Sequence, residues 1–321
     1  MKSDLKIADS MLDLIGDIPL VRLNRIGKET GAEILVKPEF LNPSGSIKDR
    51  IAKSMIEDAE KNGLVQEGST IIESTTGNTG TALAFVSAVK GYNFVSYLPD
   101  RVANKSRMAI MLAFGSGNET VDSGEESTDT SEHGGYVETA GRQICLEVER
   151  SRENVWWARQ FSHPQNTAAH RDWTVKEIIE MTDGRLDGFA VSVGTGGTLL
   201  GASQALKHHD PSITIWGVEP AGRPMMADPD TYAVIPDITD GIHLEIFESG
   251  LVDNYIAVSD AEAIDMAHRL AEEEGLFCGM SSGANVIGCL RLAEELGADK
   301  RVVTVLPDSR DRYLEVEKFT T

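Results

Sequence analysis

The stretch VSVGTGGTLLGASQAL, residues 191–206, passes from an apolar run through a loop of glycines and threonines into a helical segment. The apolar run is typical of a buried strand in a parallel sheet. Glycines let a backbone approach a ligand closely, and a helix N-terminus favours an anion such as a phosphate. The phosphate-sized loop comprises Gly194, Thr195, Gly196, Gly197 and Thr198.

Two alternatives stay open for this loop. A tight structural turn needs the same glycines without any ligand. A dinucleotide site is the second alternative, although Leu199 stands where the third glycine of GxGxxG would be. Glu219, at the end of the next apolar run, keeps that alternative open because an acidic residue there can bind a ribose. The loop is not a Walker loop, because no GK[ST] follows it.

Strand and helix patterns alternate on both sides of this stretch. Expected strands cover residues 32–36, 69–73, 93–98, 189–193, 213–218 and 301–306. Expected helices begin near residues 47 and 79 and cover residues 108–114, 199–207, 260–274 and 284–296. The alternation predicts an α/β fold with twisted, mostly parallel sheets and helices on both faces. Residues 115–136, rich in small and acidic side chains, interrupt it. We expect a solvated acidic insertion there, with a lid or docking segment as the alternative.

Composition limits the classes of partner. The 321 residues include 51 acidic and 30 basic ones, and the formal net charge is −21. This charge argues against a nucleic-acid partner, so local structure such as helix N-termini must hold any anionic ligand. The scattered Cys145, Cys278 and Cys289 form neither a disulfide framework nor a CxxC metal motif. The cysteines therefore imply a reducing compartment and no bound metal. Because no apolar run approaches about 18 residues, we expect a cytoplasmic protein without a membrane segment.

A lysine opens the helix predicted in NPSGSIKDRIAKSMIEDAEKNG, residues 42–63. The expected polar stripe of this helix consists of Asp49, Lys53, Glu57 and Glu60. Lys48 instead shares a face with the apolar residues Ala52, Met55, Ile56 and Ala59. Burial there would lower the lysine pKa, as in lysines that form a Schiff base or carry a proton. The alternative is a lysine whose ammonium extends to solvent at the rim.

A second loop, STTGNTG at residues 74–80, precedes another predicted helix. Several hydroxyl groups and backbone N–H groups at a helix start can hold a carboxylate or a phosphate, whereas a plain cap needs one hydroxyl. The candidate ligands are Thr75, Thr76, Gly77, Asn78 and Thr79. A third helix start carries Ser281 and Ser282, of which one is expected to cap the helix and the other to face a ligand.

These features have one common explanation, an amino acid bound as an imine to a phosphorylated aldehyde. The chain resembles the cysteine synthase and cystathionine β-synthase family of fold-type II pyridoxal-5′-phosphate (PLP) enzymes. The resemblance covers about residues 15–314 and rests on PSGSIKDR, STTGNTG, VGTGGT, VEP, GMSSGA and LPDS. It implies a homodimer with a two-domain fold similar to tryptophan synthase β. Residues 1–45 plus 155–321 would form the larger, PLP-binding domain, and residues 46–154 a smaller, mobile, substrate-binding domain.

The resemblance also implies a role for each motif. Lys48 would carry the internal aldimine and act as the general base, while the loop of residues 194–198 cradles the phosphate. Asn78 would bond the 3′-oxygen of PLP, and Ser281 would face its pyridine nitrogen. The substrate carboxylate would be bound by Thr75, Thr76, Gly77, Thr79 and Gln160.

The implied reaction is a β-replacement on O-acetylserine, O-phosphoserine or serine through an aminoacrylate, with a small nucleophile as the second substrate. The product would be cysteine or a related β-substituted alanine. Alternatives within the class are a cystathionine β-synthase-type condensation with a thiol, an amine addition giving a 2,3-diaminopropionate-type product, and a serine or threonine deaminase. From other classes, an NAD-dependent dehydrogenase and a non-catalytic scaffold stay open.

Beside the unusual insertion at residues 115–136, with Trp156 and Trp157 nearby, two departures from the family pattern concern the substrates. PDITDGIH, residues 236–243, replaces a glycine-rich stretch of GIGAGF type, and Thr76 replaces the usual serine of the carboxylate loop. Neither departure touches the motifs assigned to the cofactor. The sequence therefore predicts the cofactor more closely than it predicts the donor and the acceptor.

Overall fold

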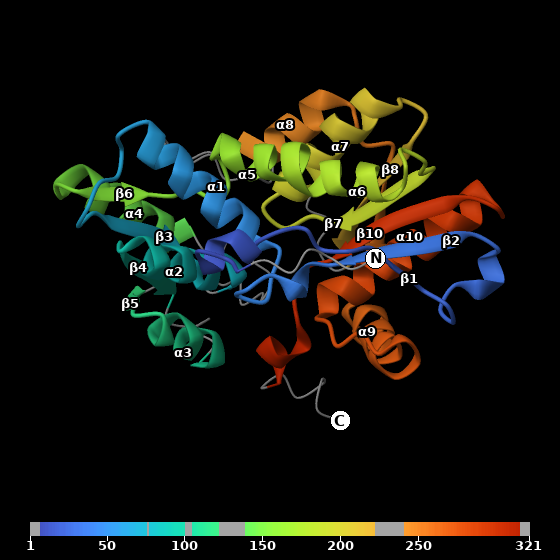
Figure 1. Ribbon diagram of the computed structural model, residues 1–321, viewed down its shortest axis with the longest axis horizontal. Coiled ribbons are helices and arrows are strands. Elements are labelled where there is room, and N and C mark those ends of the chain that lie inside the picture. The colour runs from blue at the N-terminus through green and yellow to red at the C-terminus, as the bar shows by residue number, and fades with distance from the viewer. Residues whose placement is uncertain (1–6, 76, 100–104, 122–138, 222–240, 315–321) are drawn as a thin grey trace.

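Two separate sheets form the framework of the molecule. The computed structural model describes residues 7–75, 77–99, 105–121, 139–221 and 241–314. Figure 1 shows the two sheets side by side, the smaller at the left and the larger at the right. Both are assembled from strand–helix units, as the alternating pattern of the sequence predicts.

The larger sheet has six strands in the order β1-β2-β10-β7-β8-β9. The short β1 pairs with β2 in antiparallel fashion, and the other neighbours are parallel. The strands are β1 (Val21–Arg22), β2 (Glu33–Pro38), β7 (Gly188–Ser192), β8 (Thr214–Pro220), β9 (Asn254–Val258) and β10 (Arg301–Leu306).

The smaller sheet has four parallel strands in the order β5-β4-β3-β6. These are β3 (Thr70–Ser74), β4 (Asn93–Pro99), β5 (Gly117–Val121) and β6 (Val155–Trp157). Residue 154, the expected end of the smaller domain, precedes β6, so this sheet extends past that boundary. Residues 117–121, at the start of the expected insertion, form the edge strand β5 of this sheet. Residues 122–136 of the expected insertion lie outside the described residues.

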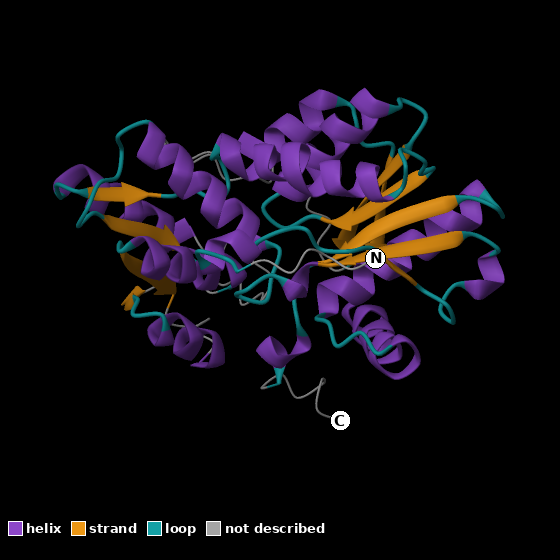
Figure 2. Cartoon of the chain, viewed as in Figure 1, coloured by secondary structure: helices purple, strands orange, loops and turns teal. Residues whose placement is uncertain are grey.

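Helices cover both faces of the larger sheet (Figure 2). The helices are α1 (Lys48–Lys61), α2 (Asn78–Lys90), α3 (Lys105–Ala113), α4 (Thr139–Ser151), α5 (Pro164–Ala169), α6 (Val175–Met181), α7 (Gly197–His209), α8 (Gly241–Ser249), α9 (Asp260–Glu274) and α10 (Met280–Leu296). A π-helical turn, His170–Thr174, joins α5 to α6. Across the described ranges, none of the helices combines the length and apolar character needed to span a bilayer.

Alternate side chains of β7 enter two different hydrophobic cores. Phe189 and Val191 pack with Leu199 of α7 on one face of the sheet. Ala190 packs with Val286 of α10 on the other face. Burial on both faces explains why the sequence of this strand is a continuous apolar run rather than an alternating one.

The six expected strands correspond to β2, β3, β4, β7, β8 and β10, which confirms the α/β class. The strands β1, β5, β6 and β9 were not predicted. Each of these is very short or carries polar residues, as in GNETV of β5 and NYIAV of β9. These four segments become strands because they pair with a neighbouring strand, and their own sequences show no clear hydrophobic pattern of a strand.

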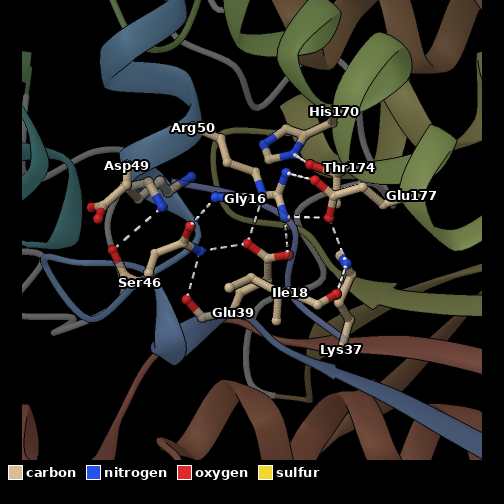
Figure 3. Close-up of polar contacts among 12 residues, drawn as sticks. Gly16, Ile18, Lys37, Glu39, Ser46, Asp49, Arg50, His170, Thr174 and Glu177 are labelled. Carbon is tan, nitrogen blue, oxygen red and sulfur yellow. Dashed lines mark hydrogen bonds and ion pairs between the residues drawn. The ribbon is translucent and has the colours of Figure 1, made fainter. Parts of the chain in front are cut away.

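A cluster of buried charges fixes α1 against the larger sheet (Figure 3). Arg50, in the first turn of α1, is fully buried. Its guanidinium donates to both oxygens of Glu39 at 2.7 and 2.8 Å and to both oxygens of Glu177 of α6 at 2.8 and 2.7 Å. Lys37 of β2 forms an ion pair with the same Glu177 at 2.6 Å. Two cations and two anions thus share one buried cluster.

The charges of this cluster support one another. Burial by itself would raise the pKa of Glu177, but the hydrogen bonds and charges of Arg50 and Lys37 outweigh burial and lower that pKa to about 2. Glu177 therefore stays ionised at neutral pH. Its negative charge in turn compensates the buried cations, which would otherwise carry a large desolvation cost.

Asp49 is fully buried, so its assignment to the exposed stripe of α1 was wrong. The backbone N–H of Ser44 donates to Asp49 Oδ2 at 2.7 Å, and the Ser44 hydroxyl donates to Oδ1. Burial raises the pKa of Asp49 to about 6. Through these two bonds the Asp49 carboxyl group holds the turn before Lys48 against the start of α1. The helical spacing of polar residues in α1 could not indicate this contact.

Replacing Arg50 by methionine should strongly destabilise the protein, because Glu39 and Glu177 would stay buried without their main partner. Removing one member of a buried ion pair costs about 3–5 kcal/mol, and we expect the free energy of unfolding in urea to fall by that amount. Arg171→Met is the control, because Arg171 pairs with Asp172 at the exposed surface, where a pair contributes about 0–1 kcal/mol. Equal losses in the two variants would contradict this account of the cluster.

Candidate active site

The predicted site residues lie just beyond the carboxyl ends of strands in both sheets. Lys48 begins α1, which follows β2, and Thr195 lies in the loop between β7 and α7. Lys48 Nζ lies 3.5 Å from Thr195 Oγ1. The lysine is partly buried, and its ammonium contacts the glycine loop instead of extending to the rim. Ligands of open α/β sheets bind at this edge.

The glycine loop opens the N-terminus of α7. Gly196 is the N-cap residue, with a φ of +88° that side chains of L-residues rarely adopt. A Cβ on Gly197 would lie 2.0 Å from Asn166 Oδ1, so glycine is required there as well. Among the described residues no side chain caps α7. Its first backbone N–H groups can therefore bind an anion, so the tight turn and the predicted anion site are the same feature.

The loop after β3 lies beside Gln160. This proximity is needed if the loop and Gln160 are to bind the same substrate carboxylate, as the sequence predicts. Thr79 Oγ1 donates to Gln160 Oε1 at 2.6 Å. Thr75 Oγ1 accepts a hydrogen bond from the N–H of Gly77 at 3.2 Å. Gly77 is the N-cap of α2, and no side-chain cap is seen there in the described part of the chain. Thr76, the remaining candidate in this loop, lies outside the described residues.

Glu73, the buried residue directly before this loop, lies in the predicted site segment, although no role was predicted for its side chain. It accepts hydrogen bonds from Gln160 N at 2.9 Å, Trp157 Nε1 at 2.9 Å and Ser74 N at 2.8 Å. Burial raises the pKa of Glu73. The carboxyl group holds the end of β3 and the Gln160 backbone together, which sets the position of Gln160 relative to the loop.

Asn78, the first residue of α2, contacts a one-turn helix near the C-terminus, η7 (Arg310–Tyr313). Arg312 Nη1 donates to Asn78 Oδ1 at 2.7 Å. Asn78 Nδ2 donates to Asp308 Oδ2 at 2.6 Å, just after the end of β10. The structure therefore adds two partners to Asn78 that the sequence motifs did not indicate.

Ser281 lies in the first turn of α10, where it is partly exposed. The N-cap of this helix is Gly279, and no side chain of the described residues caps it, so the predicted capping by Ser281 or Ser282 was wrong. Gly279 N donates to the carbonyl of Asp308 at 3.0 Å. This bond places the start of α10, and with it Ser281, beside the carboxyl end of β10.

Comparison with known proteins identifies the family. Residues 11–308 match the family model described as pyridoxal-phosphate dependent enzyme. The chain belongs to this family. The probable cysteine synthase of Bacillus subtilis (strain 168) is 39% identical over 321 residues, which cover 98% of this chain and 99% of that protein. The cysteine synthase of Staphylococcus aureus (strain Mu50 / ATCC 700699) is 34% identical, covering 98% of each chain.

Solved structures agree with this assignment. The crystal structure of O-ureido-L-serine synthase matches with a TM-score of 0.85 and 33% identity, covering 98% of this chain and 96% of that one. O-acetyl serine sulfhydrylase isoform 3 from Entamoeba histolytica matches with a TM-score of 0.86 and 32% identity, covering 100% and 94%. The protein is thus a fold-type II PLP enzyme of the cysteine synthase family, and the dehydrogenase alternative is not favoured.

The described residues of this PLP enzyme fit the cofactor. The phosphate of PLP needs an anion site, and the N-terminus of α7, which no described side chain caps, offers backbone N–H groups that suit one. Its aldehyde needs a lysine amine, and Lys48 Nζ is 3.5 Å from Thr195 of the same loop. The helix terminus and the lysine therefore lie close enough together to bind the phosphate and the aldehyde of one cofactor molecule.

Asn166 of α5 is a site residue that sequence reasoning missed. It is fully buried, and its Nδ2 donates to Thr195 Oγ1 at 2.9 Å and to the carbonyl of Gln160 at 2.6 Å. One amide thus joins the loop that opens α7 to the residue beside the β3 loop. The segment HPQNTAAH has no spacing that distinguishes this asparagine, so a single sequence offered no signal for it.

His170 is a second missed residue and begins the π-helical turn. Its Nε2 lies 3.3 Å from Thr198 Oγ1 and its Nδ1 lies 3.0 Å from Thr174 Oγ1. Burial, followed by the charges of Lys48 and Arg50, holds the pKa of His170 well below 6.5. A neutral imidazole donates through one nitrogen and accepts through the other, so it orients the Thr198 hydroxyl without adding a charge.

Replacing Asn166 by alanine should weaken PLP binding about tenfold, because the Thr195 hydroxyl and the Gln160 carbonyl would lose a shared buried donor. The measurement is the dissociation constant from titration of the PLP-free protein. Asn62→Ala is the matched control, since the Asn62 amide bonds only to Asp58 on the exposed end of α1 among the described residues. Unchanged affinity in Asn166→Ala would show that the two loops do not depend on this amide.

Proposed function

We propose that the protein replaces the β-substituent of a serine-derived amino acid with a small nucleophile, using PLP held by Lys48 and the loop before α7. The observation that carries the proposal is the 3.5 Å approach of Lys48 Nζ to Thr195 Oγ1. It joins the only lysine in the predicted motifs to the anion site that a cofactor phosphate needs. The named relatives, which are cysteine synthases and synthases of serine derivatives, support the same reaction class.

We assign the cofactor to residues from three elements. The phosphate would be held by Gly194, Thr195, Gly196, Gly197 and Thr198. Asn78 would donate to the 3′-oxygen, and Ser281 would face the pyridine nitrogen. Bound PLP supplies an electron sink for the bonds at the substrate Cα. A serine at the pyridine nitrogen does not hold a proton there as an aspartate would, which favours loss of a β-substituent over transamination.

The substrate carboxylate would bind at the start of α2. The candidate donors are Thr75, Thr76, Gly77, Thr79 and Gln160. Support comes from the hydrogen bond between Thr79 and Gln160 and from the backbone N–H groups of α2, which no side chain of the described residues caps. A helix N-terminus stabilises a carboxylate through these N–H groups and through the helix dipole.

Lys48 also provides the proton transfer of the proposed reaction. Once the substrate amine has replaced the lysine amine on the cofactor aldehyde, Lys48 Nζ can accept the proton from the substrate Cα and later return it. Its position at the first residue of α1, whose following turn is fixed by Arg50, restricts where this amine can lie. One residue can therefore act first as the attachment point and then as the base.

The proposal extends to the location, the assembly, the closure on substrate and the two substrates. We assign the protein to the cytoplasm as a homodimer, in which the smaller sheet and its helices close on the substrate. The loop proposed to bind the carboxylate follows β3 of the smaller sheet, so substrate binding would draw this sheet toward the larger one. The donor would be O-acetylserine, O-phosphoserine or serine, and the acceptor sulfide, another thiol or an amine.

Replacing Lys48 by alanine should abolish the visible absorption of the PLP-reconstituted protein, because no lysine remains to bind the aldehyde. Turnover should fall about 10²–10⁴-fold with the loss of the general base. Lys53→Ala is the control, because Lys53 lies on the same helix and donates to the carbonyl of Leu12 away from the site.

The same spectra identify the donor. Serine, O-acetylserine and O-phosphoserine are added in turn to the wild-type protein. The true donor should shift the wavelength of the visible absorption band. A wild-type protein that stays colourless after incubation with PLP would overturn the proposed function. A band that survives in Lys48→Ala would overturn the assignment of the lysine.

A further inference from the structure

Arg312, in the turn η7, contacts two motifs of the proposed site at once. The residue is 3% exposed, and its Nη1 donates to Asn78 Oδ1 at 2.7 Å. Its Nη2 donates to the carbonyl of Ser44, in the loop that leads to Lys48. A Cβ on Gly45 would lie 2.9 Å from Nη2, so glycine at this position makes room for the guanidinium. Arg312 therefore links α2 of the smaller sheet to the start of α1.

The partners of Asn78 determine which way its amide points. A guanidinium can only donate hydrogen bonds, and an ionised carboxylate can only accept them. Arg312 therefore selects Oδ1, and Asp308 accepts one hydrogen from Nδ2 at 2.6 Å. The reversed amide would set a donor against a donor and an acceptor against an acceptor. Because an amide NH₂ carries two hydrogens, Nδ2 can still donate one to a ligand.

The acceptor Asp308 is itself held in place. It is 1% exposed, and the hydroxyl of Tyr313, also in η7, donates to its Oδ2 at 2.5 Å. Its backbone carbonyl accepts from Gly279 N at the start of α10. The contacts around Asn78 thus extend to the helix that carries Ser281. They hold the Asn78 amide through residues that are themselves hydrogen-bonded.

We propose that Arg312 is a positioning residue for the cofactor, which holds the Asn78 amide with Nδ2 as the donor to the 3′-oxygen and keeps the loop before Lys48 beside it. The inference rests on the proposed function, because it uses the assignment of Asn78 to the cofactor. Arg312 acts through Asn78 and through the carbonyl of Ser44. Among the residues of the turn η7, Arg312 is the one that these bonds connect to the active site.

A double-mutant cycle tests this coupling. The dissociation constant of PLP is measured for the wild type, Arg312→Met, Asn78→Ala and the double variant. We expect Arg312→Met to weaken binding about tenfold, as does the loss of one hydrogen bond to a charged group. The double variant should lose clearly less affinity than the sum of the two single losses, because Arg312 acts in part through Asn78 and coupled residues are not additive.

A spectroscopic reading separates positioning from a general loss of structure. A donor at the 3′-oxygen favours its anionic form, so Arg312→Met should lose visible absorption in favour of the near-ultraviolet. Arg312→Lys keeps the charge but lacks the planar fork that reaches two acceptors, and it should fall between wild type and Arg312→Met. Should Arg312→Met fail to fold, Arg312→Lys replaces it in the cycle.

Arg310→Met is the matched control. Arg310 lies in the same turn and is 5% exposed, with its guanidinium 5.2 Å from the ring of Phe277. Its loss should leave the absorption spectrum and PLP affinity at wild-type values. Additive losses in the double variant, or equal spectral changes in Arg310→Met and Arg312→Met, would overturn the inference. A wild type that binds no PLP would overturn the proposed function as well, so the two failures are distinguishable.

Discussion

The paired charges of Arg50, Glu39 and Glu177 fix the position of α1, and the site depends on where this helix begins. The opposite side of α1 packs Ile51 and Met55 into the core that contains α2. The helix therefore belongs to both halves of the molecule, held by buried charge on one side and by apolar contact on the other. Lys48 lies two residues before Arg50, so its position depends on the contacts of α1 with both halves of the molecule.

Local electrostatics outweigh the charge of the whole chain at the site. A net charge of −21 would repel anions from most of the surface. The helices α2, α7 and α10 nevertheless have the glycines Gly77, Gly196 and Gly279 as their N-cap residues, and none has a side-chain cap among the described residues. Uncapped N–H groups act over a single turn, so an acidic protein can hold a phosphate and a carboxylate in its interior.

The sequence predicted features whose cause is local. Continuous apolar runs identified the central strands, and the glycine and threonine loops marked helix starts with exposed N–H groups. Asp49 was misassigned because the helical period does not show that the preceding turn folds back onto it. Arg50 was missed because its partner Glu177 lies 127 residues away. Asn166, His170 and Arg312 carry no motif of their own, and only the folded chain brings them to the loops they support.

The most direct test of the central claim is the attachment point of the cofactor. The PLP-reconstituted wild type is reduced with borohydride and digested, and its peptides are analysed by mass spectrometry. The account predicts a phosphopyridoxyl group on Lys48 and its absence from the neighbouring Lys53 and Lys37. Modification of another lysine with Lys48 unmodified, or no modified peptide at all, would contradict it.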